Sequence, residues 1–292
     1  MKRFSVGFLV VCLSACGSGS DSDVAARLDE SRADTLQVTD SASRIVSLSP
    51  AITEILFAIG AGDKVVGRTR WGDYPPEVTE IESVGDGMFP NVEAVASLQP
   101  DLVVFYQSTA NAVAREQLRE LNIPTASVRM DRLADVPEVA RILGRLTGDS
   151  LQADSIAGAF ETELARSMSA RAGVQPHCSV AIVVWDNPPM VIGGGSFLTE
   201  IVELAGSWKV FGDVDAPSPQ VSIEAIVERN PNRIMTLGIE GIPQYAERPE
   251  WQVVDAVRNS RFTAAVGSEF ARPTLRALET ARRLEELLGD CE

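Results

Sequence analysis

The sequence predicts an α/β protein with two Rossmann-like lobes, each with a mostly parallel sheet, joined by one long backbone helix. Short apolar segments alternate with helical segments through most of the chain, which is typical of parallel sheets covered by helices on both faces. A long Pro-free segment interrupts this alternation near the middle of the chain. The pattern before that segment recurs after it, which indicates two lobes of one design.

The first half alternates strands and helices from Arg44 onward. The apolar strand RIVSLSP ends at Ser49, a good N-cap, and Pro50 suits the first helical position. The helix AITEILFAIGAG is expected to end at Gly60 or Gly62. The segments that follow are strand and helix in turn: KVVGRTRW, NVEAVASLQ, DLVVFYQ, NAVAREQLRELN, IPTASVRM and DVPEVARILGRLTG.

A single amphipathic helix is predicted over residues 149–173. Its apolar side chains lie four residues apart on one stripe, namely Ile156, Phe160, Leu164 and Met168. A helix of about 20–25 residues is roughly 30–37 Å long, which is about the width of a small domain. We therefore expect this helix to link the two lobes as a rigid rod.

The second half resumes the alternation and ends in a helix from Pro273 to Leu288. Its other predicted segments are SVAIVVW (strand), SFLTEIVELAG (helix), SIEAIVERN (helix), RIMTLG (strand) and RFTAAVG (strand). Two pairs of segments reveal the repeat. VEAVASLQPDLVVF matches IEAIVERNPNRIMTL at a distance of 131 residues, and TEILFAIG matches TEIVELAG at a distance of 146.

The N-terminus predicts export and lipid attachment. Lys2 and Arg3 precede an apolar run that is shorter than the ~20 residues needed to span a bilayer. The sequence LSAC resembles a bacterial lipobox, in which Cys16 becomes the lipidated first residue; an ordinary secretory signal with an incidental Cys is the alternative. The expected parts are a signal peptide (1–15), a flexible tether (16–43), an N-terminal lobe (44–148), the linking helix (149–173) and a C-terminal lobe (174–292).

Export changes how the four cysteines are interpreted. Cys12 leaves with the signal peptide and Cys16 is lipidated, so Cys178 and Cys291 remain in an oxidising compartment. One disulfide between them is expected, and two free thiols are the alternative. No C-x-x-C spacing is present, which argues against redox catalysis.

Charge and residue types exclude several functions. Without Lys2 and Arg3 the chain keeps 24 basic and 41 acidic residues, a net charge of −17, which repels nucleic acid and anionic lipid. Membrane contact is therefore expected through the lipid anchor only. His177 is the single histidine and no G-x-S-x-G occurs, so neither an enzyme, a resident cofactor nor a metal site is expected. The segment IGGGSFLTE lacks the Lys of a phosphate-binding loop and indicates a close backbone approach instead.

Glu93 and Glu224 occupy the same place in the repeat, in the first turn of a predicted helix. A carboxylate there stabilises the helix dipole by about 0.3–1 kcal/mol, which is one explanation. The other is a pair of acidic residues, one per lobe, arranged for a partner with two-fold symmetry.

Several motifs together resemble one known family. They span residues 44 to 288 in order: RIVSLSPAITEILFAIGAGDKVVG, DYPPEV, NVEAVASLQPDLVV, PQVSIEAIVERNP and FARPTLRALETARRL. The chain is similar to the helical-backbone (class III) substrate-binding proteins of ABC importers, and within them to the periplasmic cobalamin-binding members. The resemblance implies a monomeric, extracytoplasmic lipoprotein that captures a small metal chelate and delivers it to a permease dimer. It also implies that Glu93 and Glu224 dock onto arginines of that permease.

The ligand is expected between the lobes, near the carboxyl ends of the strands. The candidate residues lie at strand ends or in loops that face the same rim, and they are Trp71, Met88, Phe89, Tyr106, Trp185, Glu269 and Arg272. Aromatic walls suit a large flat ligand such as a corrin or haem, because each ring buries roughly 150–250 Å². Glu269 and Arg272 are expected to bond the polar groups of the ligand.

The identity of the ligand is less sharply indicated than the fold. By resemblance, Trp71 replaces a tyrosine near the corrin and Tyr106 replaces a tryptophan, while Ser218 stands where another tryptophan is expected. The segment from Gly87 to Phe89 also departs from the family pattern. A corrinoid is the expected ligand, and a ferric siderophore or haem is the alternative, since such anionic chelates would use Arg68, Arg70 and Arg272.

Overall fold

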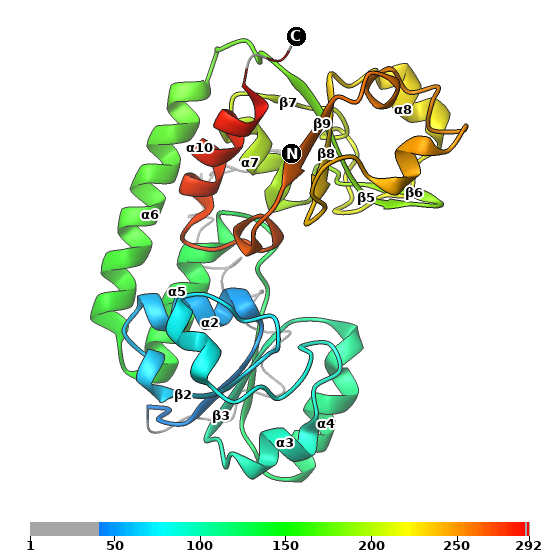
Figure 1. Cartoon of the computed structure of the whole chain (residues 1–292). Coiled ribbons are helices and arrows are strands. Elements are labelled where there is room, and N and C mark those ends of the chain that lie inside the picture. Colours follow the sequence, from blue (N-terminus) through cyan, green and yellow to red (C-terminus); the bar gives the residue numbers. More distant parts are fainter. Residues whose placement is uncertain (1–40, 290, 292) are drawn as a thin grey trace, which may run out of the picture. The chain divides into compact units, whose positions relative to one another are not determined.

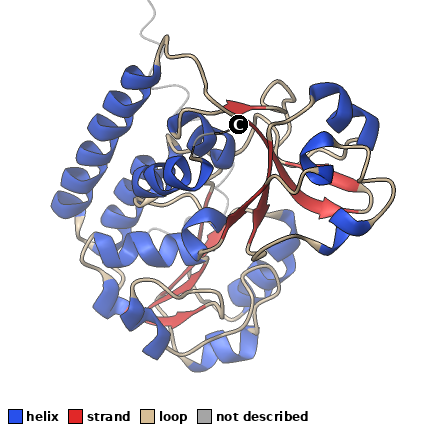
Figure 2. Ribbon diagram, turned by 45° about the horizontal axis from the view of Figure 1, so that its top comes forward, coloured by secondary structure: helices blue, strands red, loops and turns tan. Residues whose placement is uncertain are grey.

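The computed structural model describes residues 41–289 and 291; the predicted signal peptide and lipidated Cys16 lie outside the described residues. Within the described chain, two α/β lobes follow one another, and the 22-residue helix α6 (Ser150–Arg171) runs beside both of them (Figure 1). Figure 2 shows helices on both sides of the strands. The predicted fold class is therefore confirmed.

The N-terminal lobe is built on a four-stranded parallel sheet in the order β2-β1-β3-β4. Its central strand β1 (Ile45–Leu48) is buried along its whole length, as expected for a strand covered on both faces. The other elements of this lobe are α2 (Pro50–Ala58), β2 (Val65–Arg68), α3 (Val92–Ser97), β3 (Leu102–Tyr106), α4 (Ala112–Glu120), β4 (Thr125–Val128) and α5 (Asp135–Thr147).

The C-terminal lobe repeats this topology around β5 (Ser179–Asp186). Strands β5, β8 and β9 are parallel neighbours in that order, and the short β7 pairs with β5 in parallel. Strand β6 folds back on β5 as an antiparallel hairpin that the sequence pattern did not predict. The remaining elements are β6 (Pro189–Val191), α7 (Phe197–Leu204), β7 (Trp208–Lys209), α8 (Ile223–Arg229), β8 (Arg233–Leu237), α9 (Asp255–Arg258), β9 (Phe262–Ala265) and α10 (Ala277–Leu288).

The repeated sequence segments occupy equivalent elements of the two lobes. Helix α2 follows β1, and its equivalent α7 follows the β5–β6 hairpin; helix α3 precedes β3 as α8 precedes β8. The glycine-rich turn before α7 brings two backbone segments close together, as expected. A Cβ atom on Gly193 would lie 2.2 Å from the carbonyl oxygen of Ala216, so only glycine fits there.

Helix α6 forms as predicted, but the predicted stripe is only partly correct. Met168 is 55% exposed, and the buried residues of α6 are Ala153, Ala157 and Phe160. The small alanines face α5, where Gly144 of α5 lies against Ala153. The close approach of two helices therefore selects small side chains, which a pattern of large apolar residues does not reveal.

The last helix begins at Ala277, four residues later than predicted. A short 3-10 turn (Ser268–Ala271) comes first, and Arg272 then adopts an extended conformation. The turn that opens α10 is closed by a hydrogen bond from the amide of Ala277 to the carbonyl of Thr274. This irregular segment directs Arg272 and Arg276 toward the other lobe.

One apolar core runs through both lobes. It joins residues of β1, α2, α5, α6, α7 and α10, and smaller cores lie on the far face of each sheet. The Sγ atoms of Cys178, before β5, and Cys291, after α10, lie at bonding distance, with Cα atoms 5.3 Å apart. In the part of the chain that the structure describes, every helix is too short or too polar to cross a bilayer.

Candidate ligand-binding cleft

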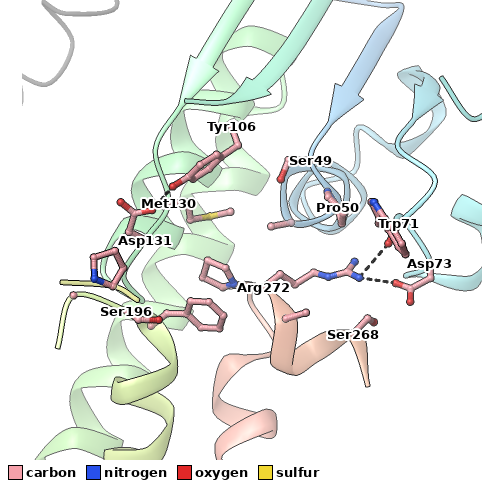
Figure 3. Close-up of a pocket in the computed structure, with 16 residues that line it drawn as sticks. Ser49, Pro50, Trp71, Asp73, Tyr106, Met130, Asp131, Ser196, Ser268 and Arg272 are labelled. Atoms are coloured by element: carbon pink, nitrogen blue, oxygen red, sulfur yellow. Dashed lines mark hydrogen bonds and ion pairs between the residues drawn. The ribbon is translucent and has the colours of Figure 1, made fainter. Parts of the chain in front are cut away.

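A cavity of about 660 Å³ lies between the lobes (Figure 3). It opens beyond the carboxyl ends of β1, β3 and β4, where parallel sheets place their ligands. The N-termini of α2 and α7, which are equivalent in the repeat, line it from opposite lobes. Its walls are Ser49, Pro50, Ala51, Trp71, Asp73, Tyr106, Met130, Asp131, Gly195, Ser196, Phe197, Pro217, Ser268, Ala271, Arg272 and Pro273.

Three aromatic side chains contribute to these walls: Trp71, Tyr106 and Phe197. Trp71 is 59% exposed, and its indole donates a 3.1 Å hydrogen bond to Asp86. Asp86 also accepts from the amide of Met88, and these hydrogen bonds lower the pKa of its carboxyl below the usual value. The charged form of Asp86 therefore orients the Trp71 ring at the cleft.

Tyr106 offers its ring to the cleft because its hydroxyl is already engaged. The hydroxyl donates to Oδ1 of Asp131 at 2.5 Å, and Oδ2 of Asp131 accepts from Arg129. The pKa of Tyr106 is raised to about 12, mainly because the hydroxyl is partly buried and secondly because of its hydrogen bond to Asp131. Tyr106 is therefore neutral at physiological pH.

Arg272 is buried at the cleft wall, and its guanidinium is surrounded by acceptors of the protein itself. It donates to Glu54 at 3.1 Å and to the carbonyl of Trp71 at 3.1 Å. Asp73 lies 3.1 Å from the same group (Figure 3). Glu54 belongs to the N-terminal lobe, so this ion pair crosses between the lobes.

The other two arginines considered for an anionic chelate are also engaged within the protein. Arg68 donates to three backbone carbonyls, those of Thr69, Thr79 and Ile81. Arg70 pairs with Asp86 at 3.0 Å. Neither arginine lines the cavity.

Four of the predicted ligand residues lie outside the lining of this cavity. Met88 and Phe89 are exposed in the loop after Asp86, and Glu269 pairs with Arg283 instead. Trp185 extends along the β5–β6 hairpin, where its indole bonds the carbonyl of Asn187. Trp71, Tyr106 and Arg272 lie together at the cavity. The roles of all seven residues in ligand binding stay predictions.

Sequence reasoning missed several residues of the cleft. Met130 and Asp131 lie two and three residues after the end of β4, and Ser49 directly follows β1, so the strand-end rule that selected Tyr106 would also have selected them. Ser49 was assigned as an N-cap, but its side chain makes no capping hydrogen bond and lines the cavity. Phe197 follows the N-cap Ser196 of α7 and carried no recognisable signal.

Glu93 and Glu224 are the second residues of α3 and α8, and both are exposed. Hydrogen bonds from its own backbone amide and from Ser222 lower the pKa of Glu224 below the usual value. Among the described residues, neither glutamate has an ion-pair partner. Helices α3 and α8 lie in different lobes, both away from α6 (Figure 1).

The chemistry of the described residues is that of a binding site. His177 uses its amide to bond the carbonyl of Gly206, and no group of three or more His, Cys, Asp or Glu side chains in residues 41–289 and 291 could hold a metal ion. A cleft between two α/β lobes with aromatic walls and internally paired charges defines a receptor that captures a small molecule.

Comparison with known proteins identifies the class. The chain belongs to the periplasmic binding protein family, whose model matches residues 45–265. Members of this family are transport proteins that bind a substrate for ABC-type transporters, not enzymes.

Three relatives show how widely the similarity extends. An ABC transporter substrate-binding lipoprotein of Bacillus subtilis is 30% identical, over 94% of this chain and 92% of that protein. The crystal structure of the periplasmic vitamin B12-binding protein of Vibrio cholerae is 27% identical, with a TM-score of 0.68 over 85% of this chain and 96% of that chain. The periplasmic haem-binding protein of Roseiflexus has a TM-score of 0.76 at 22% identity, over 86% of this chain and 99% of that chain, and this similarity concerns the fold.

Proposed function

We propose that this protein captures a corrinoid, such as cobalamin, between its lobes and delivers it to the permease of an ABC importer. The observation that carries the proposal is the pairing of Arg68, Arg70 and Arg272 within the protein. An anionic chelate needs cations that are free to bind it, and these three guanidiniums already have acceptors. A corrinoid has neutral amide side chains and a large apolar rim, so it needs no free cation.

The remaining groups of the cleft suit such a ligand. Trp71, Tyr106 and Phe197 supply aromatic surface for the macrocycle. The hydroxyls of Ser49 and Ser196 lie at the N-termini of α2 and α7, where amide groups of a ligand find donors and acceptors. The similarity to a vitamin B12-binding protein of known structure supports the same ligand class.

Titration calorimetry of the purified protein with cyanocobalamin tests this proposal. We expect a dissociation constant of about 1 μM or tighter. Haemin and a ferric siderophore, titrated under the same conditions, are expected to bind at least about tenfold more weakly. Absence of binding, or a dissociation constant weaker than about 100 μM for cyanocobalamin with tight binding of an anionic chelate, would reverse the assignment.

Delivery to the permease is assigned to Glu93 and Glu224. Both are exposed and without described ion-pair partners, and they occupy equivalent positions in the two lobes. A permease dimer with two arginine-bearing surfaces has the symmetry to meet them. Exposed ion pairs are worth little individually, so we expect these glutamates to steer docking and set its register.

We assign the lipid anchor to Cys16 and expect the protein to lie outside the cytoplasm. In that compartment we expect Cys178 and Cys291 to form a disulfide. The similarity to a substrate-binding lipoprotein over 94% of this chain supports the anchor. Replacement Cys16→Ser is expected to release the protein from the membrane fraction and to abolish labelling with a radioactive fatty acid. Labelling that persists in the variant would contradict the assignment.

A further inference from the structure

The repeat places two glutamates, Glu54 and Glu200, at equivalent positions of helices α2 and α7. They are the second residues of the matching segments TEILFAIG and TEIVELAG, 146 positions apart. Each carboxylate reaches across to the other lobe. Glu54 bonds Arg272 and Arg276 of the C-terminal lobe, and Glu200 bonds Arg132 of the N-terminal lobe.

The two contacts differ in their surroundings. Glu54 is buried, and it accepts from Arg276 twice, at 2.9 and 2.7 Å, and from Arg272 at 3.1 Å. Burial alone would lower the pKa of Arg276, but the hydrogen bonds and charge of Glu54 raise it, so this guanidinium stays charged. Arg276 also lies 3.9 Å above the ring of Tyr74. Glu54 therefore holds two cations close to the cleft.

Glu200 makes a comparable contact away from the cleft. One of its oxygens accepts from Arg132 at 2.7 Å, and the other accepts from the amide of Leu133 at 2.7 Å. Neither Glu200 nor Arg132 lines the ligand cavity. The side chain of Arg132 is 47% exposed, so water screens this pair.

The charges around Glu54 cancel. We call the group the inter-lobe ion cluster; its members are Glu54, Asp73, Glu269, Arg272, Arg276 and Arg283. Three carboxylates face three guanidiniums, and only Asp73 and Arg272 also line the cavity. Since Glu54 is shared by two arginines, its loss would leave an uncompensated positive charge behind the cleft wall.

We propose that Glu54 is a specificity-determining residue, which cancels the charge of Arg272 and Arg276 and so makes the cleft select an uncharged ligand over an anionic chelate. The proposal rests on the proposed corrinoid function and deepens it. Glu54 acts through Arg272, which is the member of the pair that reaches the cavity. Its carboxylate also holds one side of that guanidinium, and without it only the carbonyl of Trp71 and Asp73 would compete with a carboxylate or catecholate of the ligand for Arg272.

The substitution Glu54→Gln tests this role, because it keeps the size of the side chain and removes its charge. The probes are cyanocobalamin and a ferric tricatecholate, which is trianionic at neutral pH. We expect the variant to bind the tricatecholate roughly tenfold or more tightly than the wild-type protein, and to bind cyanocobalamin no better. The gain should shrink as salt is added, because its origin is coulombic.

Two further variants serve as control and support. Glu200→Gln removes the equivalent contact between the lobes without changing the charge at the cavity, so it should leave the preference between the two probes unchanged. The side chain of Asp73 is 52% exposed, so water already screens its pairing with Arg272. Asp73→Asn should therefore give a smaller gain in affinity for the tricatecholate than Glu54→Gln, and it tests the role of charge even if Glu54→Gln does not fold.

The outcomes separate the two proposals. If the wild-type protein binds no cyanocobalamin, the corrinoid proposal fails, and the tricatecholate series still decides the role of Glu54. An unchanged preference in both Glu54→Gln and Asp73→Asn would overturn that role. An equal gain in Glu200→Gln would do the same, because it would show that looser lobes, rather than charge, admit the anion.

Discussion

Glu93 and Glu224 stand at the same position of two equivalent helices, each two residues after an N-cap and one residue before the amide that the cap binds. Asn91 accepts from the amide of Ala94 at 3.0 Å, and Ser222 accepts from the amide of Ala225 at 3.2 Å. The caps satisfy these amides without the help of either glutamate. Both carboxylates therefore remain exposed and available to a partner.

Reversing both charges, with Glu93→Lys and Glu224→Lys, is expected to abolish uptake by cells while ligand affinity stays within about twofold of the wild-type value. The lysines would repel the arginines of the permease but lie outside the cleft. Growth on the ligand measures uptake, and calorimetry measures capture. The matched control is Glu120→Lys with Glu250→Lys, which makes the same change in net charge at exposed sites. Normal uptake by the first variant would refute the docking assignment.

Trp71, Trp185 and Trp208 are equally exposed, each at 59%, but only Trp71 lines the cavity. Trp71→Ala is expected to weaken cyanocobalamin binding roughly tenfold or more, because an aromatic wall of the cleft is lost. Trp208→Ala, the matched control, should leave the affinity unchanged. Trp185→Ala tests whether Trp185 binds the ligand. The strand-end prediction expects the variant to lose affinity for cyanocobalamin, whereas the position of Trp185 outside the cavity lining predicts an unchanged affinity.

The sequence was a better guide to the fold than to the cleft, for physical reasons. Strand and helix periods are local, so the alternation and α6 could be predicted. The cleft depends on which strand ends meet and on irregular segments between elements. Tyr106 was found because it ends a strand, whereas the pairing of Glu54 with Arg272 joins residues 218 positions apart and left no local pattern. The β5–β6 hairpin places Trp185 outside the lining of this cavity, and its predicted role in ligand binding stays untested.

Tyr106 is expected to ionise only at high pH, and its titration reports the contact with Asp131. Its pKa is raised to about 12 from an ordinary value of 10.0, so the contact stabilises the fold fully below pH 10 and is lost as the pH rises toward 12. The tyrosinate absorbance of the wild-type protein minus that of Tyr106→Phe isolates this group, since the pKa of Tyr245 is raised as well. A difference midpoint near pH 10 would contradict the contact.

The same variant, Tyr106→Phe, should cost about 1 kcal/mol of unfolding free energy at neutral pH, because Asp131 loses one donor while Arg129 remains. The ligand affinity of the wild-type protein should stay constant between about pH 6 and pH 9, since Tyr106 is neutral throughout that range. Urea denaturation and calorimetry provide the two measurements. An affinity that falls with pH in this window would show that another group controls binding.

A disulfide between Cys178 and Cys291 would tie the start of β5 to the chain beyond α10, across 113 residues. Replacing both with Ala is expected to lower the unfolding free energy by about 2–5 kcal/mol, because the cross-link restricts the unfolded chain. Urea denaturation with and without reductant checks this value. The wild-type protein exported from cells should contain no thiol that reacts with an alkylating agent under non-reducing conditions; a reactive pair would refute the bond.

The rigidity of the rod between the lobes depends on how closely α5 and α6 approach. A Cβ atom on Gly144 of α5 would lie 2.3 Å from the Cβ of Ala153 in α6, whereas one on Gly158, which is within α6, would meet nothing within 4 Å. Gly144→Ala is therefore expected to lower the unfolding free energy by about 1–3 kcal/mol through overpacking, and Gly158→Ala to raise it by about 0.5–1 kcal/mol through helix propensity. Spin labels in the two lobes should show a broader distance distribution in Gly144→Ala only. If both substitutions raised the stability and left the distribution narrow, the two helices would not be in close contact, and some other feature would have to hold the cleft open.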